Sequence, residues 1–447
     1  MKTPIVDFVK QYAESDISRF HMPGHKGNPF LGCEALDITE IDGADVLYSA
    51  CGIIEKSEEF TSSLFHTAHT FFSAEGSSLS IKAMLGIIKS TAKNGEKPLI
   101  LAARNVHKAF IYASALLDLD VEWLYPKATT PLCACPITAE DVEIAIQSAA
   151  RKPSAVYLTS PDYLGGIQDI RGISMVCKTH DIPLLVDNAH GAYLAFLEEN
   201  RHPIALGATM CCDSAHKTLP VLTGGAYLHV SKDAPDSFVK SARSMLALFA
   251  STSPSYLILQ SLDLCNRYLA EQYAEKLAAC IKRIDSLKKS VSENGICFKD
   301  GEPLKLVLEA KPLGYTGDEI ASYLREKKIE IEFADPDFAV FMITPENSAS
   351  DFEKLERALL DLPKKAAKKD PFPSAITKAQ NAISIREAVF SPKKTVPVTD
   401  AEGLICASPL VSCPPAVPIV MSGEIITGEA IERFLYYGTE YVDVIAT

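Results

Sequence analysis

The sequence has no excess of basic residues. Its 447 residues include 57 aspartates and glutamates against 44 lysines and arginines, so the formal net charge is −13. This balance argues against nucleic acid as the main partner, because neutralising phosphates requires a basic face. It suits a small cationic substrate, although an acidic balance is also common among soluble proteins.

Long apolar segments are missing as well. No run of about 18 apolar residues, the length that spans a bilayer, occurs in the chain. Charged residues interrupt the first 16 positions, and no basic segment precedes an apolar core there, so we expect no signal peptide. The sequence thus predicts no membrane partner.

The chain contains 12 cysteines but no C-x-x-C pair. Cys133 and Cys135 form a C-x-C pair, Cys211 and Cys212 are adjacent, and the others are scattered. This distribution predicts reduced, mostly buried thiols in a cytoplasmic protein rather than a disulfide framework or a zinc site. We therefore expect no metal ion.

Hydrophobic residues make up 47% of the chain and charged residues 23%, as in globular proteins, and the length suggests about two to four domains. In the middle of the chain, short apolar runs alternate with helical segments. The runs Pro98–Ala102, Ala155–Thr159 and Pro183–Val186 have the composition of buried parallel strands, and helices are predicted at Ser78–Thr91 and Glu140–Ala150. This alternation predicts an α/β domain with a mainly parallel sheet.

The second half of the chain has a different pattern. A long helical segment from Tyr256 to about Glu293 leads into a smaller region that we predict to be α+β. Its strands are expected at Lys305–Leu308, Ile329–Phe333 and Phe338–Ile343, and its helices at Gly317–Lys327 and Asp351–Leu362. The basic, proline-containing segment Pro363–Pro373 is typical of a linker. We therefore divide the chain into an N-terminal arm (1–60), a large domain (61–255), a small α+β domain (256–362) and a linker with a C-terminal domain (363–447).

The candidate site residues are those that directly follow the predicted strands, because α/β sheets bind ligands at the carboxyl ends of their strands. Asp187 follows one such strand, and Lys217 lies about thirty residues later between hydroxyl and histidine side chains. Pyridoxal phosphate needs this pair: an amine forms an imine with its aldehyde, and a carboxylate keeps the pyridine nitrogen protonated so that the ring accepts electrons. The pair predicts this cofactor.

A phosphate-binding segment accompanies the pair. Gly76-Ser77-Ser78 opens a predicted helix, where backbone N–H groups and hydroxyls bind phosphate, although the same pattern is typical of an ordinary N-cap. His107 follows the next strand and is a candidate for lying flat against the ring, although a lone histidine is often simply hydrogen-bonded to its neighbours.

Segments along almost the whole chain resemble the ornithine/lysine/arginine decarboxylases, a family of fold-type-I pyridoxal phosphate enzymes. The segments similar to family motifs are Phe20–Gly27 (H-x-P-G-H-K-G), Arg104–Lys108 (R-N-x-H-K), Ser160–Gly165 (P-T-Y-x-G), Val186–Ala192 (V-D-E-A-H-G), Ser214–Lys217 (S-x-H-K) and Ser251–Tyr256 (S-T-S-x-x-Y). Ile385–Ala388, Pro414-Pro415 and Gly423-Glu424 resemble the family's C-terminal domain. The resemblance implies a large domain with a mainly parallel sheet, a smaller α+β domain and a C-terminal domain.

The resemblance also implies roles for individual residues. Lys217 would carry the cofactor, Asp187 would pair with the pyridinium, and His190 would lie beside the ring near the reacting carbons. His107 would lie against the ring. The residues implied at the phosphate are Ser77, Ser78, Ser214 and His216. The resemblance also implies a homodimer with shared active sites, in which Thr252 (or Ser253) would reach the phosphate bound by the partner subunit. Glu332 would lie near the distal cationic end of the substrate, unless it is simply a solvent-facing strand residue.

The implied reaction is decarboxylation of arginine, lysine or ornithine to the amine and carbon dioxide, and the short chain favours arginine. Asn188, Tyr193 and Gly224 depart from common family residues without removing a catalytic group. Two alternatives stay open: another fold-type-I enzyme such as an aminotransferase, and a non-catalytic regulator. An aminotransferase would need an arginine that binds the α-carboxylate of the substrate, and we cannot identify one. A non-catalytic regulator would have no need of Lys217 and Asp187, so their presence argues against this alternative.

Overall fold

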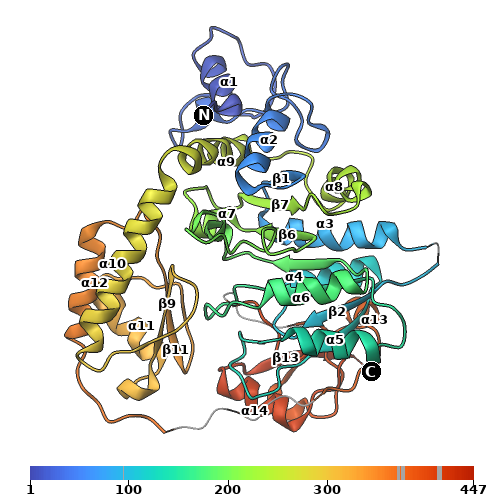
Figure 1. Ribbon diagram of the computed structural model, residues 1–447, viewed down its shortest axis with the longest axis vertical. Helices are drawn as coiled ribbons and strands as arrows, with labels where there is room; N and C mark the ends of the chain where they lie inside the picture. Colours follow the sequence, from blue (N-terminus) through green and yellow to red (C-terminus); the bar gives the residue numbers. More distant parts are fainter. Residues whose placement is uncertain (94, 370–372, 374–377, 410–414, 447) are drawn as a thin grey trace. The chain divides into compact units, whose positions relative to one another are not determined.

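The computed structural model describes residues 1–93, 95–369, 373, 378–409 and 415–446 (Figure 1). Two of the sequence assignments fall partly outside them, namely Pro414 and positions 370–372 of the expected linker. The chain forms two compact units. Unit 1 consists of Met1–Glu96, Ser154–Ser160 and Ile170–Lys276, and unit 2 consists of Lys97–Pro153, Pro161–Asp169 and Leu277–Thr447.

Unit 1 contains five strands that lie in the order β1-β7-β6-β5-β4. These are β1 (His69–Ser73), β4 (Ala155–Thr159), β5 (Leu184–Asp187), β6 (Met210–Asp213) and β7 (Ala226–Val230). The strands β4, β5 and β6 are parallel, whereas β7 runs antiparallel to both of its neighbours. Four of these five strands therefore share one direction, which agrees with the mainly parallel sheet expected from the sequence.

Unit 1 also contains helices, several of which pack on this sheet. They are α1 (Pro4–Ala13), α2 (Ile53–Phe65), α3 (Gly76–Thr91), α6 (Ile170–Thr179), α7 (Ala215–Thr218), α8 (Asp236–Phe249) and α9 (Tyr256–Tyr268). Helix α3 packs against β1, β6 and β7 and against α8 (Figure 1). Nine residues of α3 are buried, because its apolar side chains extend around most of its circumference.

The N-terminal helix α1 is held in unit 1 by a buried carboxylate. The oxygen Oδ2 of Asp263, on α9, accepts hydrogen bonds from the backbone N–H groups of Ile5 (2.9 Å) and Val6 (3.0 Å). These donors belong to the first turn of α1, which the side chain of Thr3 leaves uncapped. Asp263 thus caps a helix that is distant in the sequence.

Unit 2 contains a four-stranded antiparallel sheet in the order β10-β11-β9-β8. Its strands are β8 (Phe298–Lys299), β9 (Lys305–Glu309), β10 (Phe333–Ala334) and β11 (Phe338–Met342), and the nearby helices are α10 (Ala274–Ser292), α11 (Gly317–Glu326) and α12 (Ala349–Leu360). Capping boxes at Thr316 and Ser348 start α11 and α12. A π-helical turn, Leu269–Tyr273, joins α9 to α10, so the expected long helical segment is present.

One expected strand of this sheet is shorter than predicted. Instead of Ile329–Phe333, the strand β10 covers Phe333–Ala334. The chain leaves α11 through a turn in which Lys328 has a φ of 60° and Ile329 N donates to the carbonyl of Leu324. The residues that follow helix α11 are therefore used to close that helix, and the strand starts later.

The rest of unit 2 is built around two further strand pairs. The strands β2 (Leu99–Ala103) and β3 (Asp120–Leu124) are parallel, and β12 (Lys393–Pro397) and β13 (Tyr441–Ile445) are antiparallel. The helices here are α4 (Lys108–Leu117), α5 (Ala139–Ser148), α13 (Ile385–Phe390) and α14 (Gly428–Tyr436). A cluster of buried apolar residues that includes Ile426, Phe434 and Val444 forms the core of the C-terminal part.

Eleven cysteines lie among the described residues, and all carry free thiols, eight of them buried. This state agrees with the reduced thiols expected from the sequence. Within the described part of the chain, no helix is both long and apolar enough to cross a membrane.

Candidate active site

Asp187 is the last residue of β5 and lies buried at the end of the sheet of unit 1. Its Oδ1 accepts from the backbone N–H of Ala189 at 3.2 Å and from the thiol of Cys212 at 3.7 Å, and its Oδ2 accepts from the hydroxyl of Tyr157 at 3.3 Å. Burial raises the pKa of the Asp187 carboxyl above its ordinary value, and the positive charge of Lys217 offsets part of that rise. A buried carboxylate with such long hydrogen bonds is stabilised by a cationic partner.

Lys217 lies in the short helix α7, directly after β6. Its Nζ is 3.0 Å from Nε2 of His190, which belongs to the loop after β5. In this pair the ammonium group donates, and a neutral imidazole accepts through Nε2. The ends of two adjacent parallel strands thus bring together the three residues that the sequence marked as catalytic, as expected for ligand sites in α/β sheets.

The expected phosphate-binding residues meet at the N-terminus of α3. The hydroxyl of Ser214, just before α7, donates to that of Ser77 at 2.8 Å, and Ser78 lies in the same first turn. Helix α3 starts at Gly76, whose φ of 72° favours glycine and whose N–H donates to the carbonyl of Gly224 at 2.7 Å. A Cβ at Gly76 would have no atom within 4 Å, so the positive φ rather than crowding favours glycine at this position.

His216 is held by its Nδ1, which lies 2.9 Å from the carbonyl oxygen of Gly225. The ring must donate through Nδ1 to this carbonyl, so it would donate to a phosphate only when both nitrogens carry protons. Thr252 is exposed, and the loop that contains it is tied to the residue before α3, because Ser251 N donates to Glu75 Oε1 at 2.7 Å.

Two expected site residues belong to unit 2. His107 is the N-cap of α4, and its Nδ1 accepts from the backbone N–H of Ala109 at 3.1 Å, which fixes the orientation of the ring. Glu332 is half-buried, accepts a short hydrogen bond from the hydroxyl of Tyr163, and donates its backbone N–H to Val340 at 3.0 Å. A purely solvent-facing position for Glu332 is therefore wrong.

Sequence reasoning missed two residues that hold the Asp187 carboxylate. Tyr157 lies on β4 and Cys212 on β6, and both side chains reach the carboxylate from neighbouring strands. Asp187 and Cys212 are paired in the parallel register of β5 and β6. The segment of β6 was not predicted as a strand; aligning its end with that of the strand before Asp187 would have revealed Cys212, because paired residues point to the same face of a sheet.

The arrangement fits pyridoxal phosphate. The cofactor needs a buried carboxylate for its pyridinium, an amine for its aldehyde and a helix N-terminus with hydroxyls for its phosphate. Unit 1 provides all three: Asp187 at the end of β5, Lys217 on α7 directly after β6, and the pair of Ser77 and Ser214 at the N-terminus of α3.

Two family models match the chain. The model described as the Orn/Lys/Arg decarboxylase major domain matches residues 3–307, and the model of the C-terminal domain of Orn/Lys/Arg decarboxylases matches residues 361–442.

Among curated proteins, the chain is similar to two arginine decarboxylases over almost its whole length. That of Bacillus subtilis is 29% identical over 472 residues, which cover 96% of this chain and 92% of the relative. That of Halalkalibacterium halodurans is 30% identical over 457 residues, which cover 95% of this chain and 91% of the relative.

Solved structures show the same fold. The lysine decarboxylase of Francisella novicida superposes with a TM-score of 0.81 at 16% identity and covers 99% of this chain and 81% of its own. The constitutive lysine decarboxylase of E. coli gives a TM-score of 0.78 at 17% identity, covering 100% and 82%. The fold is that of the fold-type-I enzymes, which confirms the fold class expected from the sequence.

Proposed function

The chain belongs to the Orn/Lys/Arg decarboxylase family, and we propose that arginine is the amino acid that it decarboxylates. The family, the cofactor pyridoxal phosphate and the reaction class, cleavage of a basic amino acid into an amine and carbon dioxide, are those expected from the sequence. Arginine is favoured by the names of the relatives that align along almost the whole chain. The net charge of −13 also suits a cationic substrate.

When bound, pyridoxal phosphate supplies an acceptor for the electron pair that remains on Cα after carbon dioxide leaves. We propose that Asp187 keeps the pyridine nitrogen protonated, because its buried carboxylate is stabilised by a cation. Ser77, Ser214 and the N-terminus of α3 would hold the phosphate. His107 would lie against the ring, in the orientation that Ala109 N fixes.

The pair of Lys217 and His190 would handle the proton. The amine of Lys217 lies within hydrogen-bond reach of His190 Nε2, at 3.0 Å, so a proton can pass between the two side chains. One of the two groups would return a proton to Cα after carbon dioxide has left. The 3.0 Å contact between these two side chains carries the proposal of a catalytic pair.

We propose Glu332 as the residue that recognises the distal positive charge of the substrate. Its position is only half-buried, and the hydroxyl of Tyr163 orients one carboxylate oxygen, which leaves the other available for a guanidinium group. We also propose that two copies of the chain share their active sites through the exposed loop that contains Thr252.

The assignment is tested with the purified protein loaded with pyridoxal phosphate and offered arginine, lysine and ornithine in turn. We expect carbon dioxide and agmatine from arginine, at a kcat/KM well above that for the other two amino acids. Turnover of none of them would exclude the decarboxylase assignment, and amino transfer to a keto acid would favour an aminotransferase. Lys217→Ala should abolish both turnover and the visible absorption band of the protein loaded with pyridoxal phosphate.

The role of Glu332 is tested by Glu332→Gln. Loss of one charge-assisted contact should raise KM for arginine by about one to two orders of magnitude, with a smaller change in kcat. Glu330→Gln is the matched control, because Glu330 lies two residues away, is exposed and pairs with Arg325. Equal KM values for the two variants would exclude Glu332 from substrate recognition.

A further inference from the structure

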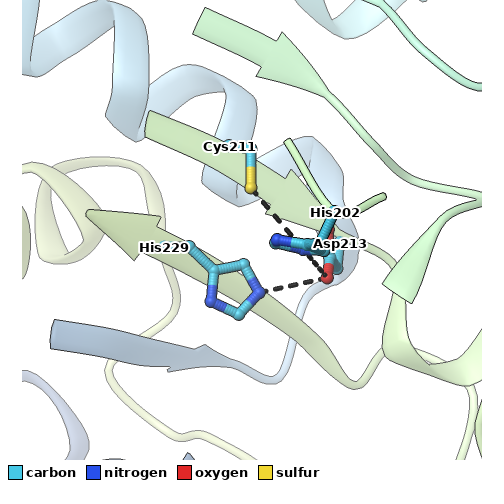
Figure 2. A group of neighbouring side chains, drawn as sticks. All are labelled: His202, Cys211, Asp213 and His229. Carbon is cyan, nitrogen blue, oxygen red and sulfur yellow. Dashed lines mark hydrogen bonds and ion pairs between the residues drawn. The ribbon is translucent and has the colours of Figure 1, made fainter. Parts of the chain in front are cut away.

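Four potential metal ligands meet in the interior of unit 1: His202, Cys211, Asp213 and His229 (Figure 2). We propose that they form a structural zinc site. Each side chain is at most 1% exposed, and the four ligand atoms all lie within 4.8 Å of one another. None of the four residues belongs to the candidate active site described above, and the proposal does not depend on the substrate.

The register of the sheet explains why three of the four side chains meet. Cys211 and Asp213 are two residues apart on β6, so they point to the same face. His229 on β7 is paired directly with Cys211, which brings its ring to that face as well. His202 comes from the loop that precedes β6 and completes the group, as Figure 2 shows.

This face is opposite to the one that serves the cofactor. Cys212, between Cys211 and Asp213, points the other way and donates to Asp187. The zinc site and the candidate active site therefore use alternate residues of the same strand.

The distances fit tetrahedral coordination. His202 Nε2 and His229 Nε2 lie 3.0 and 3.1 Å from Asp213 Oδ2, and Cys211 Sγ lies 3.9 Å from His202 Nε2. Around zinc, bonds of about 2.0–2.3 Å to nitrogen, oxygen and sulfur place neighbouring ligand atoms roughly 3.3–3.8 Å apart. These three separations need shifts of a few tenths of an ångström to match, and the remaining separations, at most 4.8 Å, need shifts of up to about 1 Å. The set of two imidazoles, a thiolate and a carboxylate is also one that zinc prefers.

Charge supports the same ion. A thiolate and a carboxylate carry two negative charges, and two neutral imidazoles carry none, so one divalent cation makes the group electrically neutral. Neutrality matters here because an uncompensated charge in a site this deeply buried is costly. With four protein ligands and almost no exposure, the site resembles structural zinc sites, which are closed, rather than catalytic ones, which keep an open position.

A second set of groups orients the ligands. His229 Nδ1 lies 2.8 Å from the hydroxyl of Thr70, so this nitrogen can carry the proton while Nε2 faces the metal. Asn188 Nδ2 donates to Asp213 Oδ1 at 2.6 Å, which leaves Oδ2 for the ion. The ring of Phe65 lies 4.6 Å from that of His229 and 5.3 Å from that of His202, and it closes the site with an apolar wall.

The first experiment measures the metal content of the full-length protein purified with pyridoxal phosphate and without chelators. We expect about one zinc ion per chain, measured by inductively coupled plasma mass spectrometry. Cobalt introduced during refolding should give a thiolate-to-cobalt charge-transfer band, a signature that needs no variant and is independent of activity. A chain that holds no stoichiometric zinc, either as purified or after refolding with zinc, would overturn the proposal and identify the group as a metal-free hydrogen-bonded network.

Two variants complete the test. Cys211→Ser should lower zinc content at least about tenfold and remove the cobalt band. Cys177→Ser is the matched control, because Cys177 is also buried, at 1% exposure, but lies on α6 away from the four ligands. If Cys211→Ser does not fold, the cobalt band of the unaltered chain still decides. Full zinc content in folded Cys211→Ser would overturn the proposal.

Discussion

An ion pair between Arg104 and Glu424 gives the sharpest stability prediction. The guanidinium nitrogens Nη1 and Nη2 donate to Oε1 and Oε2 of Glu424, both at 2.6 Å. Glu424 is fully buried, and only 10% of the side chain of Arg104 is exposed. The pair connects the segment after β2 with the C-terminal part of unit 2, across 320 positions of sequence.

We predict that Glu424→Gln destabilises unit 2 strongly. The variant keeps the shape of the side chain but removes its charge, and the amide NH2 of glutamine then faces a guanidinium N–H that needs an acceptor. Within the described part of the chain, the guanidinium's remaining hydrogen bond runs from Nη2 to the carbonyl of Ile419 at 3.4 Å, and its Nε has no hydrogen-bond partner. Removing one partner of a buried pair costs about 3–5 kcal/mol, because the remaining charge is uncompensated.

Thermal unfolding and limited proteolysis measure this effect. A loss of this size should lower the midpoint of unfolding by about 10 °C. Cleavage should accelerate first in the C-terminal part of unit 2, which the pair holds in place.

Glu330→Gln provides the matched control, since it makes the same change in an exposed pair with Arg325 in the same unit. Exposed pairs contribute about 0–1 kcal/mol, so the midpoint should hardly change. If the two variants lost the same amount of stability, the argument from burial would be refuted.

The remaining predictions concern unit 1. Burial raises the pKa of Asp263 from 3.8 to about 6, so between these pH values the folded chain holds a proton that the unfolded chain releases. The free energy of unfolding should therefore fall as pH rises through this window, by up to about 3 kcal/mol from this group. Thermal unfolding at a series of pH values measures this dependence. If Asp263→Asn showed the same dependence of stability on pH as the unaltered chain, the raised pKa of Asp263 would be contradicted. Ser214→Ala should weaken pyridoxal phosphate binding about tenfold or more in equilibrium dialysis, through loss of a hydrogen bond to a charged group, whereas Ser63→Ala, an exposed change on α2, should leave it unchanged. Equal affinity in both serine variants would remove Ser214 from the phosphate site.

Local patterns in the sequence were enough to find the elements that present the proposed catalytic groups. The strand Ala155–Thr159 was predicted with its observed bounds, because a short branched run between turn residues is characteristic of a buried parallel strand. Asp187 and Lys217 were identified for a related reason: in α/β sheets, the residue after a strand lies at the ligand-binding edge. These inferences need only neighbouring residues.

Contacts set by strand order could not be found in this way. The edge position of β1 beside β7, which lies about 150 residues later, has no local signal. The same holds for Arg104 and Glu424, and for the four proposed zinc ligands, whose spacing of 9, 2 and 16 residues matches no metal-binding motif. The sequence-based expectation of no metal ion rested on such motifs, and the proposed zinc site is the test of it.

The departure at Asn188 from the family's glutamate is explained by the residue that it contacts. Its amide nitrogen lies 2.6 Å from Asp213 Oδ1, in an interior where both side chains are fully buried. A carboxylate at position 188 would face that of Asp213 without a donor between them, and two like charges at this distance repel strongly in a low-dielectric interior. The amide instead donates to Asp213 while its neighbour Asp187 serves the opposite face. The unusual residue beside the cofactor's aspartate is therefore best understood as part of the buried group behind β6, and its identity follows from the charge of that group rather than from the reaction.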